Sequence, residues 1–99
     1  MRILITEGAP KITHKPKPPR SEIEEGDDWK WCVRIKGLKP ITVTLYHNED
    51  WRAETTYNGK MTMFRTIIRE VSAADKGSYE LDVSNDLGTV SVRHKLRVI

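Results

Sequence analysis

The chain has 99 residues, of which 37% are hydrophobic and 31% charged, and 17 basic against 14 acidic side chains give a formal net charge of +3. This composition fits one soluble globular domain and excludes a highly charged unfolded chain. No apolar run reaches the roughly 18 residues that a membrane span needs, and no secretory signal opens the sequence. The single cysteine, Cys32, excludes an internal disulfide, which favours a reducing, intracellular location.

The N-terminal segment is rich in proline, which disfavours helix and favours extended backbone. We expect residues 1–9 to be a linker or a segment added for expression, and residues 10–99 to form a single domain that begins with a short strand. The stretch from Lys11 to Arg20 is basic and could approach phosphate or acidic partners. Nucleic-acid binding is not expected, because no aromatic residues interleave with this charge to stack on bases.

From Asp28 onward the hydrophobic pattern has the period of two that is typical of half-buried strands. Over residues 28–36 this period puts Cys32 on the outward face and predicts an inward set of Trp29, Trp31, Val33 and Ile35. Residues 41–47 repeat the alternation, with Val43 and Leu45 inward. Both segments therefore predict strands with one buried face.

The pair Asn58-Gly59 is typical of a tight hairpin, so we expect a weak strand before it to pair with a strand over residues 61–68. In that second strand Phe64 and Ile68 are expected in the core. Two further alternating segments follow, and their predicted inward residues are Tyr79, Leu81, Val83, Val90, Val92, Leu96 and Val98. Short strands separated by turns, with no helical period, predict a β-sandwich or barrel.

The segment DKGSYELDVSNDLG resembles the motif D-x-G-x-Y-x-C-x-A-x-N-x-x-G of immunoglobulin domains, and the matching positions are Asp75, Gly77, Tyr79, Asn85 and Gly88. Residues 24–31 and 37–45 are similar to the family's second strand with its preceding turn, and to its third strand. Over roughly residues 10–98 the chain thus resembles the intermediate (I-set) immunoglobulin domain that is repeated in giant muscle and cytoskeletal proteins.

This resemblance implies an all-β, immunoglobulin-like sandwich of two antiparallel sheets with Greek-key connections and no internal disulfide. It also implies that Tyr79 is the tyrosine corner, whose hydroxyl bonds to upstream backbone. Counted from the motifs, the family's two cysteines fall on Val33 and Leu81, and its core tryptophan falls on Leu45. We expect Trp31, on the same face as Val33, to fill the volume that the missing tryptophan leaves.

Cys32 is displaced by one residue from the family's cysteine position, so it belongs to the opposite face and is expected to be a surface thiol. Three roles stay open for it: an inert exposed thiol, a redox-sensitive or intermolecular-disulfide site, and a metal ligand. Lys30 and Arg34 on the same face make the redox role worth testing. Of the other two tryptophans, Trp29 is expected to cover the end of the core and Trp51 to lie on a loop.

Other candidate chemistry is sparse. The three histidines are His14, His47 and His94. Their spacing does not fit a metal site, and they are expected at the surface or at strand edges. The adjacent acidic pairs are expected in solvated turns, these being Glu24-Glu25, Asp27-Asp28 and Glu49-Asp50. The sequence has no glycine-rich phosphate loop and no serine nucleophile elbow, so we expect no catalysis, no cofactor and no metal.

The resemblance implies a cytoplasmic structural and interaction module of a tandem-domain sarcomeric or cytoskeletal protein, monomeric in isolation, with neighbouring domains and other proteins as partners and neither nucleic acid nor membrane. Edge strands are the general binding prospect, but the prolines and the outward Arg93, Lys95 and Arg97 could instead protect them. Two alternatives stay open. One is an extracellular adhesion or receptor domain, against which the absence of a disulfide and of an N-x-[ST] site argues. The other is a redesigned domain of this fold.

Overall fold

The computed structural model describes residues 8–13, 18–59 and 63–99. In this part of the chain every element but one is a strand, and the exception is a single turn of 3-10 helix, η1. The elements in chain order are β1 (Lys11–Thr13), β2 (Glu22–Ile23), β3 (Trp29–Lys36), β4 (Ile41–His47), β5 (Asp50–Tyr57), β6 (Met63–Ile68), η1 (Ala73–Asp75), β7 (Gly77–Asn85) and β8 (Gly88–Val98).

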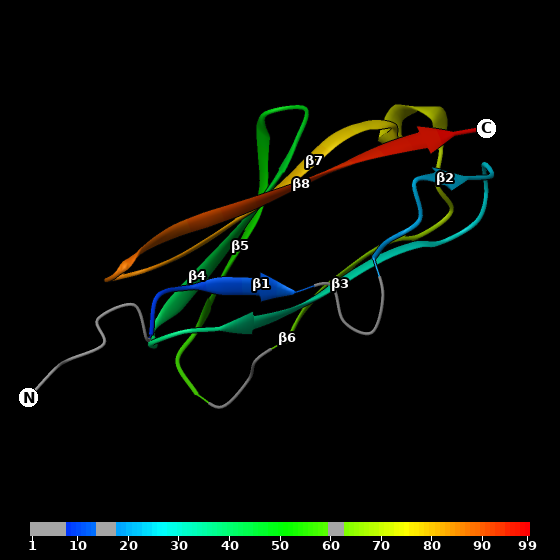
Figure 1. The fold of residues 1–99 in the computed structure, drawn as a ribbon. Coiled ribbons are helices and arrows are strands. Elements are labelled where there is room, and N and C mark those ends of the chain that lie inside the picture. The colour runs from blue at the N-terminus through cyan, green and yellow to red at the C-terminus, as the bar shows by residue number, and fades with distance from the viewer. Residues whose placement is uncertain (1–7, 14–17, 60–62) are drawn as a thin grey trace, which may run out of the picture.

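The strands form two sheets, one of three strands in the order β1-β3-β6 and one of five in the order β2-β8-β7-β4-β5. Figure 1 shows β1 lying beside β3 in one layer and the long β7–β8 pair above them in the other. All pairs are antiparallel except β2 and β8, which run parallel and bring an early segment of the domain beside its last strand. The predicted sandwich of two sheets is therefore confirmed.

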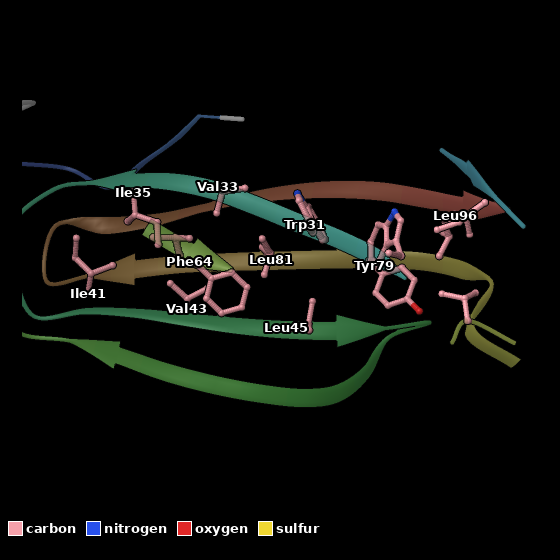
Figure 2. Packing of buried hydrophobic residues seen from close by; sticks show 14 residues of the cluster. Trp31, Val33, Ile35, Ile41, Val43, Leu45, Phe64, Tyr79, Leu81 and Leu96 are labelled. Carbon is pink, nitrogen blue, oxygen red and sulfur yellow. The ribbon is translucent and has the colours of Figure 1, made fainter. Parts of the chain in front are cut away.

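The core lies between the sheets and follows the period-two pattern of the sequence. In β3 the burial alternates residue by residue, and in β4 every second side chain is buried. Figure 2 shows these side chains pointing from both sheets into one shared interior. The buried apolar set is Ile23, Trp29, Trp31, Val33, Ile35, Ile41, Val43, Leu45, Phe64, Val71, Tyr79, Leu81, Val83 and Leu96. Of the other residues predicted inward, Ile68, Val92 and Val98 are partly buried against this cluster.

The prediction of a hairpin at Asn58-Gly59 is wrong. β5 pairs with β4 and β6 pairs with β3, so the two strands that flank this turn belong to different sheets. The hairpin turn lies earlier, where Asn48 and Glu49 adopt φ of 50° and 74° and join β4 directly to β5. Both φ values are positive, as a tight two-residue hairpin loop requires.

Two tryptophans lie elsewhere than the sequence pattern predicts. Trp51 is on β5 rather than on a loop, and its side chain is 61% exposed. Trp29 does not merely cover the end of the core, because it is only 1% exposed and its indole N–H donates to the carbonyl of Arg20 at 2.9 Å. That hydrogen bond satisfies the one polar atom of the ring, which lets the indole be buried at little cost.

Candidate functional site

The positions that the sequence resemblance assigns to two cysteines and a core tryptophan hold packed aliphatic side chains. Val33 on β3 and Leu81 on β7 are both 0% exposed, and Leu45 on β4 is directly opposite Leu81 in the register. All three belong to one hydrophobic cluster. The two sheets are thus held together here by apolar packing, in the place where the related motif has a covalent link.

Trp31 lies on the same face of β3 as Val33 and is fully buried. Figure 2 shows its ring extending from β3 into the space between the sheets. The ring centroid is 5.9 Å from that of Trp29 and 5.9 Å from that of His94. Trp31 therefore packs in a group of rings centred on Trp29, which also contacts Tyr79 at 4.9 Å, and it lies where a volume lost from β4 could be refilled from β3.

The segment from Asp75 to Tyr79 forms a tightly bonded corner. The Tyr79 hydroxyl donates to the backbone carbonyl of Asp75, four residues upstream, as the tyrosine corner requires. The Asp75 carboxylate accepts the backbone N–H of Ser72 at 2.8 Å and so closes η1. Burial and, to a smaller extent, the Asp75 charge raise the pKa of Tyr79 to about 12, while Arg52 opposes both.

Gly77 lies in the same corner, at a position where a side chain would clash with its surroundings. Its φ is +127°, and a Cβ placed there would overlap the side chain of Asn48. Asn48 needs that space, since its Oδ1 accepts the backbone N–H of Ser78 at 2.9 Å and its own N–H donates to the Ser78 carbonyl at 2.7 Å. The glycine therefore lets the β4–β5 turn bond to the start of β7.

Asn85 connects three segments at the opposite end of β7. Its amide Nδ2 donates to the carbonyl of Gly8 at 2.7 Å and to that of Leu38 at 3.0 Å, while its Oδ1 accepts the N–H of Leu87 at 2.8 Å. Gly8 also accepts the Leu38 N–H at 2.7 Å. One side chain thus fastens the chain entering the domain to two turns.

His47 is a residue that the sequence pattern assigned wrongly. It is 5% exposed, and Nε2 lies 2.8 Å from the Lys76 carbonyl while Nδ1 lies 3.1 Å from Nη2 of Arg52. A guanidinium can only donate, so Nδ1 accepts and Nε2–H donates to Lys76. The alternation of β4, continued by one step, would have placed this ring inward.

The other two histidines differ from His47 and from each other. His94 is partly buried, with Nε2 3.0 Å from the Arg20 carbonyl, and His14 lies outside the described residues. Among the described residues no group of three histidine, cysteine or acidic side chains is arranged to hold a metal ion.

Cys32 is partly buried on the outer face of β3, directly opposite Arg65 of β6. It borders a shallow hollow of about 340 Å³ that is also lined by Pro18, Pro19, Arg20, Asp28, Trp29 and Lys30.

Of the acidic pairs in turns, Asp28 accepts the N–H of Glu70 at 3.0 Å and forms an exposed ion pair with Arg69 at 3.5 Å. The Asp28 carboxylate therefore bonds the turn before β3 to the segment that follows β6.

The sheets end in four strands, β1 and β6 in one sheet and β2 and β5 in the other. The last strand, β8, is not an edge strand over its C-terminal part, because β2 pairs with Arg97 and Val98. β5 is the longest of the four and carries the exposed Trp51. No helix in the described ranges is long and apolar enough to span a membrane.

The comparison with protein families matches residues 10–98 to the model of the immunoglobulin I-set domain. No curated protein sequence matches. Among solved structures, the titin M4 domain is 23% identical with a TM-score of 0.77 and covers 94% of this chain and 98% of its own. An immunoglobulin domain in the C. elegans twitchin kinase fragment is similar at 24% identity and a TM-score of 0.75, over 96% of this chain and 22% of that one.

A structure of the complex between titin M10 and an obscurin-like 1 immunoglobulin domain also matches, at 15% identity and a TM-score of 0.74, over 92% of this chain and 94% of the other. At these identities each likeness establishes the fold. The twitchin fragment is several times longer than this chain, so its kinase activity belongs to other parts of that protein.

Proposed function

The chain belongs to the immunoglobulin I-set family, and we propose that it is a non-catalytic structural and interaction module of a tandem-domain sarcomeric or cytoskeletal protein. In this proposal residues 10–99 form one cytoplasmic domain, monomeric in isolation, that contacts neighbouring domains of its own chain. Domains of this family are typically not enzymes. The likeness to titin and twitchin domains supports the muscle or cytoskeletal setting.

A domain in the cytoplasm has to be stable without a disulfide, and the aliphatic pair Val33 and Leu81 supports this. Each side chain contributes roughly 1.5 to 3 kcal/mol by removing apolar surface from water. A disulfide at these positions would contribute about 2 to 4 kcal/mol. A cysteine pair also buries apolar surface, so the net gain from Val33 and Leu81 is smaller than this sum and offsets part of the missing bond.

The observation that carries the proposal is the bonding of β2 to the end of β8. In addition to the pairing within the strands, three backbone hydrogen bonds join their ends, from Arg97 N–H to the Ser21 carbonyl at 2.8 Å, from Ile99 N–H to the Ile23 carbonyl at 2.9 Å, and from Glu25 N–H to the Ile99 carbonyl at 2.9 Å. The exposed Arg97–Glu22 ion pair lies beside them at 3.5 Å. These bonds link the early part of the domain directly to its last residue.

Because β2 and β8 are parallel, the N-terminal end of β2 and the C-terminal end of β8 lie at opposite ends of the pair. Tension on the two chain ends therefore pulls the two strands in opposite directions along their length. The strands must then slide past each other, and all three hydrogen bonds oppose the movement together. Peeling would instead break them one at a time. The pairing thus suits a spacer or mechanical link between neighbouring domains.

The test is force-induced unfolding of a tandem repeat that carries Glu25→Pro. Glu25 is the second residue of a turn whose third residue, Gly26, has φ of +94°, and proline is favoured at that second position. The substitution therefore removes the hydrogen bond to Ile99 without disturbing the turn. The control is Glu24→Pro, because the N–H of Glu24 donates to no described residue. A lower unfolding force for Glu25→Pro alone supports the proposal, and equal forces for both variants would refute it.

A further inference from the structure

Every charged side chain on the strands of the three-stranded sheet is basic. The strands β1, β3 and β6 contain no aspartate and no glutamate. Their five basic side chains are all exposed, and they are Lys11, Lys30, Arg34, Lys36 and Arg65. We call this surface the basic face. It holds five of the 17 basic residues and none of the 14 acidic ones, so the rest of the chain is acidic on balance.

The register places all five charges on the same side of the sheet. Lys30, Arg34 and Lys36 alternate with buried residues along β3, so they share the face that points away from the core. Lys11 of β1 is directly opposite Lys36, and Arg65 of β6 is directly opposite Cys32, which lies between Lys30 and Arg34. The charges therefore extend across the sheet as well as along it.

This arrangement works against stability. Like charges directly opposite each other on neighbouring strands repel, and Lys11 and Lys36 are such a pair. The ion pairs among the described residues involve Asp28, Glu80 and Glu22, and none of these carboxylates pairs with a basic residue of this face. Asp28 borders the face beside Lys30, but its ion pair is with Arg69. The outer face of the other sheet is different, since Arg93 pairs with Glu80 there and Ser91 bonds Asp82. The repulsion among these basic side chains lowers the stability of the free domain. A ligand that neutralises their charge would explain why they are gathered on one face.

The edge of β6 offers the second element of a binding site. β6 pairs with β3 on one side, and within the described ranges no strand pairs with its other side. It is six residues long and has no proline, whereas the opposite edge strand, β1, is three residues long and directly follows Pro10. Backbone donors and acceptors on this side of β6 pair with no strand of the described ranges, and an added strand would use them.

We propose that the basic face and the β6 edge bind an extended acidic segment of another protein, with carboxylates at every second residue. An added strand points alternate side chains to one face, at a repeat of roughly 6.5 to 7 Å, which is also the spacing of Arg34 and Lys36 along β3, and Lys30 lies two such repeats before Arg34. No aromatic ring lies outward on these strands to stack on a base, which disfavours single-stranded nucleic acid. The inference rests on the proposed function as an interaction module and names its partner class.

The experiment measures binding of a peptide of alternating glutamate and threonine to the whole 99-residue protein by titration calorimetry, at low and at physiological salt. A block peptide of the same composition, with its glutamates contiguous, tests whether the alternation matters. The variant Arg34→Gln, Lys36→Gln, Arg65→Gln removes three charges of the basic face. Its matched control, Lys76→Gln, Lys95→Gln, Arg97→Gln, removes three exposed charges elsewhere.

The alternating peptide should bind more tightly than the block peptide, weaken as salt rises, and lose about tenfold in affinity with the basic-face variant. The control variant should change affinity by less than about twofold. Slower amide hydrogen exchange in β6 on binding would identify strand addition. Equal affinity for both peptides, equal loss with both variants, or tighter binding to duplex DNA or to phosphatidylserine vesicles would each overturn the proposal.

The basic-face variant should fold, because none of its three side chains is in an ion pair among the described residues. The control variant loses the exposed Arg97–Glu22 pair, which contributes at most about 1 kcal/mol to stability. Matching unfolding midpoints and tryptophan spectra check this. The outcome is also separable from the proposed function. If the domain resists force through β2 and β8 but ignores the acidic peptide, only the present inference fails. If it binds the peptide but shows no dependence on Glu25, only the mechanical proposal fails.

Discussion

The imidazole of His47 stacks on the phenol ring of Tyr79, with ring centroids 4.3 Å apart and planes inclined by 10°. The two rings come from neighbouring strands, β4 and β7, and their polar atoms bond the same turn. The Tyr79 hydroxyl donates to the Asp75 carbonyl and His47 Nε2–H donates to that of Lys76. The start of β7 is therefore fixed from both strands at once.

Tyr79→Phe removes one of these hydrogen bonds and leaves the stack in place. We expect the free energy of unfolding to fall by about 1 kcal/mol, because Asp75 is only partly buried and water can replace the lost donor. Urea unfolding measures the change. Tyr46→Phe is the control, since the Tyr46 hydroxyl bonds no described residue, and equal losses in both variants would show that the corner hydroxyl contributes nothing.

The stability of the domain should fall at high pH through Tyr79. The folded pKa is about 12, above the usual value of 10.0, chiefly because the ring is buried. The unfolded state then loses its proton first, so this contribution is complete below pH 10 and is lost as the pH rises towards 12. Unfolding midpoints measured across that range should decline less steeply in Tyr79→Phe, and parallel declines would contradict the assignment.

Trp31→Ala tests whether the ring fills the place of the missing core tryptophan. Truncation of a fully buried tryptophan should lower the free energy of unfolding by about 3 to 5 kcal/mol. Trp51→Ala, at an exposed position of β5, should change it by no more than about 0.5 kcal/mol. Chemical denaturation of both variants decides the point, and a loss under about 1 kcal/mol for Trp31→Ala would place the ring outside the core.

Gly77→Ala and Gly88→Ala separate backbone strain from steric overlap. Both glycines have positive φ, of 127° and 153°, so each alanine should cost on the order of 1 to 3 kcal/mol in strain. Only at Gly77 would the new Cβ also meet Asn48, since nothing lies within 4 Å of a Cβ at Gly88. The unfolding free energy should fall further for Gly77→Ala, and the reverse order would contradict the packing of Asn48 against this corner.

The sequence predicted those features of the fold that depend on a pattern within a single segment. The alternation of β3 and the motif from Asp75 to Gly88 indicated a sandwich, and the structure has one. The hairpin at Asn58-Gly59 was beyond such reasoning, because turn chemistry is local whereas the partner of β6 is set by contacts such as Val33 with Phe64, far apart in the sequence.

The surroundings of single residues were still harder to predict. The burial of His47 depends on the Lys76 carbonyl, 29 residues away, and no pattern in β4 reveals that partner. Similarly, the outward direction of Lys30 and Arg34 follows from the alternation of β3. That Lys11 and Arg65 lie beside them follows only from the register between strands.

The measurement that tests the mechanical account most directly compares two directions of pulling on a single domain. In a Cys32→Ser background, handles attached through Arg20→Cys and Ile99→Cys load β2 and β8 in shear, whereas handles through Arg20→Cys and Lys95→Cys pull the same strands apart from one end. The account predicts a clearly higher unfolding force in the first geometry. Equal forces in the two geometries would contradict it.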